Sequence, residues 1–282
     1  MSEVSVIDLV VDAGSPACRR GGPEQWVYSA GGNAVFMIHV EAGGLTCLVN
    51  GRIVDLGAGY LYVFWAATPH KMLRGREDTR ASFVTLPFTF LFDGALPQEF
   101  ARLLLEGHVI GRRAHGVRDA RLFERWERDL LAASPRSRDA TLLEIRARLV
   151  RFAHGIPCET PCVLPGFASN MVERLATHVA AHYPERLSAR DLSAQLELRP
   201  AYAMAQFRKS FGMSLGRYVA HHRVAHAKRL LAITDLPVRD IALVSGFVSV
   251  RRMSAAFRRV LQCSPAAFRR RYRLAPVTGA RP

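Results

Sequence analysis

The chain has 282 residues, 49% of them hydrophobic, which is enough apolar material for two ordinary domains with buried cores. The sequence contains no apolar run of about eighteen residues, which excludes a membrane-spanning helix, so we expect no membrane partner. Acidic Glu3, Asp8 and Asp12 interrupt any signal-peptide pattern, so we expect a cytoplasmic protein.

Residues 26–90 alternate short β-rich runs with turn signals, which predicts an all-β sandwich or barrel. The clearest turn is Asn50-Gly51, because both residues tolerate positive φ and they separate two apolar runs. The runs that we expect to form strands are Val35–Glu41, Leu45–Val49, Ile53–Leu56, Tyr60–Trp65 and a further pair ending near Leu86-Pro87.

The turns of this segment resemble those of a cupin barrel, of the type that senses small molecules in bacterial regulators. They are Gly44, Asn50-Gly51, Gly57–Gly59 and Thr68-Pro69-His70. The resemblance implies a pocket for a small-molecule effector. The candidate lining residues are Trp26, His39, Glu41, Trp65 and His70. Taken singly, each is equally well explained by packing or by a solvent-facing position.

We expect no metal ion and no other cofactor. Metal-using cupins carry a His-x-His pair with a nearby Glu, whereas His39 and Glu41 have no second histidine beside them, and His70 alone cannot complete a three-ligand site. Cys158 and Cys162 are spaced like the start of a metal site, but no second pair accompanies them, so an ordinary loop is favoured. The five cysteines of the chain are scattered and do not indicate a disulfide framework.

Two apolar periodicities predict amphipathic helices after the barrel. Their residues are Leu122, Trp126 and Leu130, then Leu142, Ile145, Leu149 and Phe152. These helices either cover the barrel or form the interface of a homodimer. A Pro/Gly-rich stretch follows and marks the best domain boundary. We therefore divide the chain into an effector-sensing domain with a helical arm (1–155), a linker (156–167), a DNA-binding domain (168–275) and a tail (276–282).

The net charge of +15 is concentrated at the carboxyl end. Residues 1–164 contain 19 Lys or Arg and 18 Asp or Glu, whereas residues 165–282 contain 20 and 6, so +14 lies in the second segment. Nearly all of it is arginine, whose planar guanidinium pairs with phosphates and guanine edges. Charge alone favours nucleic acid, but it leaves open a merely solvated basic surface or one that meets anionic lipid.

The carboxyl-terminal segment contains an internal repeat with an offset of fifty residues. The offset aligns Phe207-Arg208-Lys209 with Phe257-Arg258-Arg259, Ser214 with Ser264, and Tyr218 with Phe268. Each copy indicates a helix, a turn and a helix. The predicted helices are Ser188–Leu196 with Pro200–Phe211, and Pro237–Ser245 with Ser249–Leu261.

The two helix-turn-helix units are joined by a predicted helix, Leu215–Ile233, that spans roughly 29 Å at 1.5 Å per residue. Two recognition helices held about that far apart fit successive major grooves of double-stranded DNA, about 34 Å apart, with modest bending. In the second unit, Gly246 supplies a left-handed residue after the first helix and Ser249 an N-cap for the next. The first unit has the capping-box-like Ser188 and Asp191, but its turn lacks these signals.

The second repeat is similar to the sequence signature of AraC-type transcription regulators. The resemblance rests on Ile241-Ala242, Gly246-Phe247, Ser249, Phe257-Arg258-Arg259 and Ser264–Arg269. Within that family, Phe64–His70 and Tyr202–Met204 are similar to regulators of the melibiose operon, which implies a sugar-type effector. The chain departs from the family pattern at Met253, Ala255 and Gln262, where phenylalanine, arginine and glycine are usual.

The outward faces of the two predicted recognition helices supply the candidate DNA contacts. On the second helix, Val250, Met253 and Phe257 should pack inward, and we expect Arg251 to reach a guanine edge. The first helix has no arginine guanidinium facing the bases, so it can contact only thymine methyls or follow the shape of the groove. The candidates are Ala201, Tyr202, Met204, Ala205, Arg208, Lys209, Ser249, Arg251, Arg252, Ser254, Arg258 and Arg259. The alternative is that the arginines only raise affinity through counterion release.

The sequence therefore predicts an α+β regulator that binds double-stranded DNA and a small effector, for which the resemblance implies a carbohydrate, and that contacts RNA polymerase if it is an activator. Two alternatives stay open: an architectural DNA-binding protein without an effector, and a cupin enzyme with a basic appendage. No catalytic arrangement with supporting context occurs in the sequence, so we expect no enzyme activity.

Overall fold

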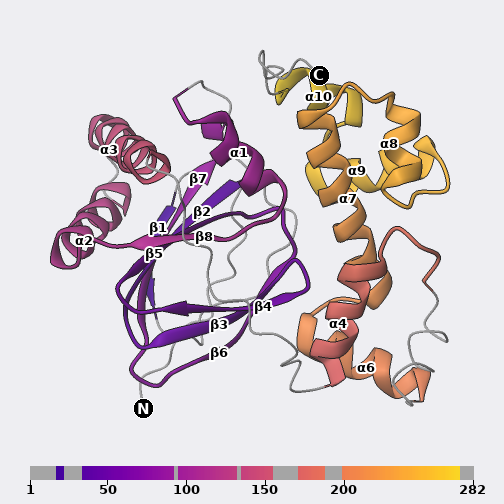
Figure 1. Cartoon of the computed structure of the whole chain (residues 1–282), viewed down its shortest axis with the longest axis horizontal. Coiled ribbons are helices and arrows are strands. Elements are labelled where there is room, and N and C mark those ends of the chain that lie inside the picture. Colours follow the sequence, from indigo (N-terminus) through magenta and orange to yellow (C-terminus); the bar gives the residue numbers. More distant parts are fainter. Residues whose placement is uncertain are drawn as a thin grey trace.

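The computed structural model describes residues 17–21, 34–91, 95–131, 135–154, 171–187 and 199–273. Within these ranges an N-terminal part made of β-sheets and covering helices lies beside a C-terminal helical part (Figure 1). The predicted linker, Cys158, Cys162 and the predicted helix Ser188–Leu196 lie outside the described residues.

The N-terminal part contains two antiparallel sheets. The five-stranded sheet has the order β1-β7-β2-β5-β8, and the three-stranded sheet the order β4-β3-β6. The strands are β1 (Ala17–Gly21), β2 (Ala34–Ala42), β3 (Gly44–Val49), β4 (Arg52–Gly57), β5 (Tyr60–Trp65), β6 (His70–Gly75), β7 (Arg80–Pro87) and β8 (Ile110–Arg113). The strands expected from the sequence are confirmed, whereas β1 and β8 were not predicted.

The predicted cupin-like barrel is not closed. No backbone ladder joins strands of the two described sheets. The sheets instead pack through a cluster that includes Ile38, Cys47, Val54 and Phe64, and the Gly57 N–H of β4 donates to the Tyr62 hydroxyl of β5 at 2.8 Å. The architecture is therefore a two-sheet sandwich. Alternation along the strands is compatible with either arrangement, which is why the sequence did not separate them.

The predicted turn between β3 and β4 is confirmed. Asn50 and Gly51 have φ values of 50° and 74°, the left-handed pair that a two-residue hairpin of this type requires. Gly51 also packs directly on Ala180 of helix α4 (Met171–His182), where an added Cβ would lie 2.1 Å from the Ala180 Cβ. This turn therefore joins the N-terminal sheets to the C-terminal helices.

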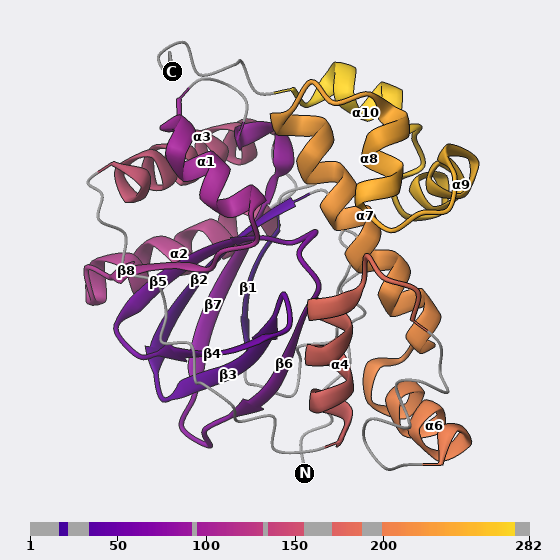
Figure 2. The ribbon, with the colours of Figure 1, turned by 45° about the vertical axis from the view of Figure 1, so that its right-hand side comes forward.

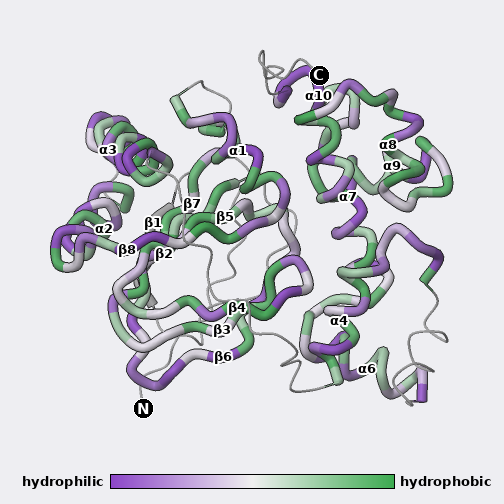
Figure 3. Tube along the Cα trace, viewed as in Figure 1, coloured by the Kyte–Doolittle hydropathy of each residue, from purple (hydrophilic) through white to green (hydrophobic). Residues whose placement is uncertain are grey.

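Helices cover the outer face of the five-stranded sheet. They are the short 3-10 helix η2 (Phe88–Leu91), α1 (Gln98–Leu105), α2 (Val117–Leu131) and α3 (Pro135–Ala153). Figure 3 shows that α2 and α3 alternate hydrophobic and hydrophilic residues, as covering helices should. Trp126, Ile145, Leu149 and Phe152 are fully or almost fully buried, so the two predicted amphipathic helices are confirmed.

The C-terminal helical part is organised around one long helix, α7 (Leu215–Ile233). The other helices are α4 (Met171–His182), α6 (Pro200–Phe211), α8 (Val238–Val244), α9 (Val250–Leu261) and α10 (Pro265–Arg271). Figure 2 shows α4 and α6 near one end of α7, and α8, α9 and α10 near the other. The bounds of α6 and α7 agree with the sequence prediction, and those of α8 and α9 agree within one residue at each end.

The fifty-residue repeat is visible in the backbone. Gly212 and Gln262 are the left-handed C-caps of α6 and α9, with φ values of 67° and 55°. Ser214 and Ser264 are the N-caps of the helices that follow, each accepting a hydrogen bond from the backbone N–H three residues later. The departure at Gln262 therefore keeps the backbone conformation that favours glycine.

Candidate DNA-binding surface

Helices α8 and α9 are joined by a tight turn whose conformation the sequence specifies locally. Gly246 has a φ of 83°, and the backbone N–H groups of Gly246 and Phe247 donate to the carbonyls of Leu243 and Ala242 at 2.9 and 2.8 Å. The Ser249 hydroxyl accepts a hydrogen bond from the N–H of Arg252 at 3.3 Å and caps α9. The turn sets the angle at which α9 leaves the helical core.

One face of α9 is buried and the opposite face is open to solvent. Met253, Ala256 and Phe257 are 0 to 5% exposed. Val250 is 37% exposed, so the prediction that it packs inward was wrong; it is the first residue of the helix, where only the turn precedes it. The candidate contacts Ser249, Arg251, Arg252, Arg258 and Arg259 are exposed and Ser254 is half-buried.

Helix α6 has the same division into two faces. Ala203, Phe207 and Phe211 are buried, and the rings of Phe207 and Phe211 stack with centroids 4.4 Å apart. Pro200 occupies its first turn, where the missing N–H has no helical acceptor. Of the candidate contacts, Ala201, Tyr202, Ala205, Arg208 and Lys209 are exposed and Met204 is half-buried.

Helices α6 and α9 are both anchored to α7, near its opposite ends (Figure 2). α6 also contacts the three-stranded sheet, where Lys71 of β6 donates to the carbonyl of Ser210 and lies 4.5 Å from the ring centroid of Phe211. Tyr218 of α7 packs edge-on against Phe207 and Phe211 of α6, with centroids 5.3 and 5.1 Å apart. The carboxyl-terminal half of α7 shares a buried cluster with Met253 and Phe257 of α9. At 1.5 Å per residue, the 19 residues of α7 span about 29 Å, as expected from the sequence.

The exposed charge of these helices is positive. α9 contains no acidic residue, and arginine or lysine occupies the last turn of both α6 and α9. Two further arginines are held by the fold, because Arg269 donates to the carbonyl of Leu236 at 2.6 Å and Arg273 pairs with Asp235. The exposed arginines of α9 therefore have no carboxylate on their own helix with which they could pair.

The residues expected to line an effector pocket do not come together. His39 is 2% exposed on the face of the sheet covered by α2, with its ring centroid 5.6 Å from that of Phe123. Glu41, also on β2, accepts a hydrogen bond from the hydroxyl of Ser82 at 3.0 Å. Trp26 lies outside the described residues.

The other two candidates, His70 and Trp65, lie at opposite faces of the five-stranded sheet. His70 packs between the sheets against Phe36 and Phe64, at centroid distances of 5.4 and 5.0 Å, and burial lowers its pKa to about 4. Trp65 lies on the opposite face, stacked on Phe88 at 5.2 Å. Of the described candidates, Trp65 alone lines the pocket described next.

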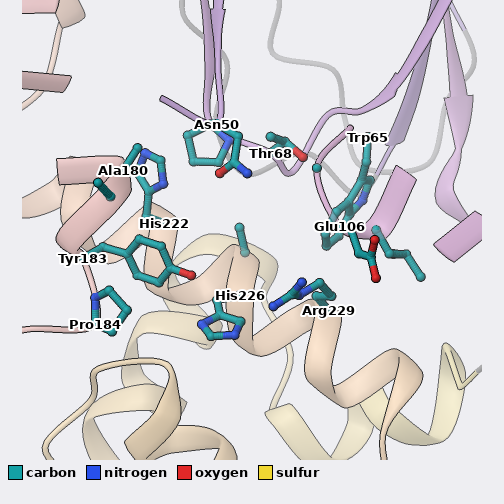
Figure 4. Close-up of a pocket in the computed structure, with 15 residues that line it drawn as sticks. Asn50, Trp65, Thr68, Glu106, Ala180, Tyr183, Pro184, His222, His226 and Arg229 are labelled. Carbon is teal, nitrogen blue, oxygen red and sulfur yellow. The ribbon is translucent and has the colours of Figure 1, made fainter. Parts of the chain in front are cut away.

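A pocket of about 250 Å³, here called the junction pocket, lies between the sheets and the helical part. Figure 4 shows the side chains of Asn50, Thr68, Trp65 and Glu106 on the sheet side, facing residues of α4 and α7. The helical side contributes Ala180, Ala181, Tyr183, Pro184, His222, Ala225, His226 and Arg229. The sequence analysis missed this site. The i, i+4 spacing of His222 and His226 on a predicted helix was the available signal.

The described residues contain no group of three or more histidine, cysteine, aspartate or glutamate side chains that could hold a metal ion. The two cysteines whose surroundings are described, Cys47 and Cys263, are free thiols. No helix in the described ranges is long and apolar enough to cross a membrane.

Comparison with known proteins supports a DNA-binding role for the C-terminal helical part. Residues 192–271 match the family described as "Helix-turn-helix domain". The melibiose operon regulatory protein of Escherichia coli strain K12 is 24% identical over 239 residues, covering 81% of this chain and 78% of that protein. The HTH-type transcriptional activator AarP of Providencia stuartii is 30% identical over 103 residues, covering 36% of this chain and 76% of AarP.

A solved structure of the DNA-binding domain of AdpA in complex with a target DNA is 28% identical and covers 36% of this chain and 93% of its own, at a TM-score of 0.35. The sequence relatives and the matched segment define a helix-turn-helix DNA-binding protein. The chain belongs to the AraC-type family of transcription regulators, as its sequence signature indicated. The relatives named above are regulators rather than enzymes, in agreement with the prediction.

Proposed function

We propose that the chain is a cytoplasmic, effector-responsive regulator that reads a specific operator through two helix-turn-helix units. In this proposal, residues 168–275 form the DNA-binding domain, the linker is 156–167, and residues 1–155 form a cupin-related sensing domain. RNA polymerase and a second copy of the chain are its proposed protein partners, and 276–282 form a tail.

The observation that carries the proposal is the pairing of two exposed helix faces, on α6 and α9, with one long helix buried between them. Arg251 lies in the first turn of α9, the part of a recognition helix that enters the major groove first. We assign Arg251 a bidentate contact to guanine O6 and N7, with Arg252 and Ser254 beside it. Arg258 and Arg259, in the last turn, are assigned to phosphates.

The face of α6 has a different proposed role. Its outward residues carry no group that could make a bidentate hydrogen bond to a base edge, so this helix follows groove shape and contacts thymine methyls. These residues are Ala201, Tyr202, Met204 and Ala205. Arg208 and Lys209 hold phosphates in the same way as their repeat partners on α9. The first unit thus provides orientation and the second provides polar discrimination.

The test begins with duplexes selected from a random-sequence pool by the full chain. Binding of wild type and Arg251→Ala is then measured on every single-base variant of the selected site. We expect Arg251→Ala to weaken binding by roughly 5- to 150-fold, corresponding to 1–3 kcal/mol, and to relax the preference at one base pair. Arg136→Ala, at an exposed arginine of α3, is the control and should bind as wild type. Equal weakening on all sequences would show that Arg251 contributes charge alone.

A further inference from the structure

We propose that His178 and His182, one turn apart on α4, bind a divalent transition-metal ion such as Zn²⁺, and that the bound ion stabilises the end of this helix beneath the turn that precedes α9. The pair supplies two protein ligands, fewer than the groups of three that are absent from the described residues. Water completes the coordination of the ion. The pair does not line the junction pocket, and the binding of the ion does not depend on the proposed function.

The two imidazoles already lie face to face. Residues four apart on a helix are neighbours on its surface, and the ring centroids of His178 and His182 are 4.4 Å apart, with an interplanar angle of 28°. Both side chains are partly exposed, so an ion can reach them in the folded protein. Histidine is the commonest protein ligand of such ions. Binding requires rotation of the side chains, so that one nitrogen of each ring lies about 2.0–2.1 Å from the ion.

Glu185 orients the second imidazole of the pair. Its Oε1 lies 3.0 Å from Nδ1 of His182, so that Nδ1–H donates to the carboxylate and Nε2 is left to bind the ion. A carboxylate behind a ligating histidine is common in zinc sites, because it fixes the ring and makes the other nitrogen a stronger ligand. Glu185 is therefore a positioning residue of this site and not a ligand.

The same spacing of histidines occurs on α7, at His222 and His226, but an ion cannot reach both rings there. His222 is 2% exposed and packs against the rings of Tyr183 and Tyr218, at centroid distances of 5.6 and 4.7 Å. Its Nε2 is buried. Accessibility therefore favours the pair on α4 over the pair on α7.

The segment that follows the pair supports the turn between α8 and α9. Arg223 of α7 donates to the carbonyls of Tyr183 and Glu185 at 2.7 and 2.8 Å. Gly246, in the turn, packs so closely on Pro184 that an added Cβ would lie 2.6 to 2.9 Å from the Pro184 backbone. An ion bound to the last turn of α4 therefore stabilises the segment on which this turn rests.

The test is calorimetric titration of the full chain with Zn²⁺ and Ni²⁺, with Mg²⁺ as the comparison. Two imidazoles supply half of the ligands of a structural zinc site, which corresponds to a dissociation constant of about 1–200 µM for Zn²⁺. Mg²⁺ prefers oxygen ligands and should bind far more weakly. The proposal is overturned if neither Zn²⁺ nor Ni²⁺ binds below about 1 mM, or if Mg²⁺ binds as tightly as they do.

Variants locate the ion on α4. His178→Gln and His182→Gln each remove one imidazole and should weaken Zn²⁺ binding by about tenfold or more. Glu185→Gln removes the charge behind His182 and should weaken binding by about tenfold. His154→Gln, at an exposed histidine that follows α3, is the matched control and should bind as wild type. Undiminished binding in folded His178→Gln and His182→Gln would refute the assignment.

A measurement on the wild-type chain decides the same point if a variant does not fold. The EPR spectrum of bound Cu²⁺ should show coupling to two imidazole nitrogens, and a spectrum without nitrogen coupling would overturn the proposal.

Hydrogen exchange tests the stabilising effect of the ion. With Zn²⁺ bound, the backbone amides of residues 183–187 and 244–249 should exchange several-fold more slowly, whereas those of α3 should be unchanged. His178→Gln should abolish this protection. Slower exchange at 183–187 alone would refute the link between the ion and the turn before α9, while leaving the metal site itself supported.

Discussion

Replacing Lys228 by methionine should stabilise the protein at neutral pH. The side chain is 1% exposed, and its Nζ lies 4.7 Å from the ring centroid of Trp65 and 5.8 Å from those of Phe88 and Phe268. No described residue accepts a hydrogen bond from Nζ. Burial lowers the pKa of Lys228 from 10.5 to about 7, because the ammonium loses its hydration. Methionine is similar in length, flexible and uncharged.

The size of the effect follows from the two pKa values. Between about pH 7 and 10.5 the unfolded chain holds a proton on Lys228 that the folded chain has released, so the contribution of this group to stability rises with pH. The difference between the two pKa values corresponds to about 5 kcal/mol, and the attraction of the ammonium to the rings offsets about 2 kcal/mol. We expect Lys228→Met to raise the free energy of unfolding by about 2–3 kcal/mol at pH 7, and this gain should largely disappear by about pH 10.

Urea unfolding of wild type and Lys228→Met, at about pH 7 and pH 10, measures this difference directly. Lys209→Met removes an exposed lysine of α6 and should leave the free energy of unfolding nearly unchanged at both pH values. The reasoning is refuted if Lys228→Met is less stable than wild type at pH 7, or if the gap between the two proteins does not narrow as pH rises.

Two further substitutions test the packing of each part. Asp119 receives two hydrogen bonds of 2.8 Å from buried Arg148, so Asp119→Ala should lower the free energy of unfolding by about 3–5 kcal/mol, measured in urea. Replacing both residues together, Asp119→Leu with Arg148→Met, should recover most of that loss; no recovery would argue against the ion pair as the cause. Gly246→Ala should lower the free energy of unfolding by more than about 1–2 kcal/mol, because the φ of Gly246 is 83° and the new Cβ would lie 2.6 to 2.9 Å from the Pro184 backbone. Gly216→Ala, at a helical glycine with open space, should be neutral or stabilising, and equal losses in both glycine variants would contradict this explanation.

The helical part was predictable because its signals are local. Ser249, Gly246 and Pro200 each specify the backbone within a few residues of themselves, and the structure places them at the cap, the left-handed turn and the first turn of a helix. Gln262 shows the limit of such signals. It adopts the left-handed C-cap without being glycine, so the residue type alone does not indicate that role.

The N-terminal part was less predictable because its determinants are non-local. β8 has four residues, two of them arginine, and is a strand only because it pairs with β5. Both faces of β2 are buried, so alternation along this strand cannot tell which face is covered by helices and which by the second sheet. The resemblance to cupins assigned His39 to a pocket, whereas its ring packs beside Phe123 of α2. The junction pocket depends on packing between parts that no local pattern encodes.

The long helix α7 connects α6, α9 and the junction pocket. The amino-terminal half of α7 packs on α6 through Tyr218, and its carboxyl-terminal half packs on α9 and α10 through the cluster that contains Leu231. His222, His226 and Arg229 of the same helix, spaced four and three residues apart, form one side of the junction pocket. Because close-packed helices move as units, a displacement of α7 relative to the sheets would act on both α6 and α9. It would also strain the contact of α6 with β6, where Lys71 donates to the carbonyl of Ser210 and lies over the Phe211 ring.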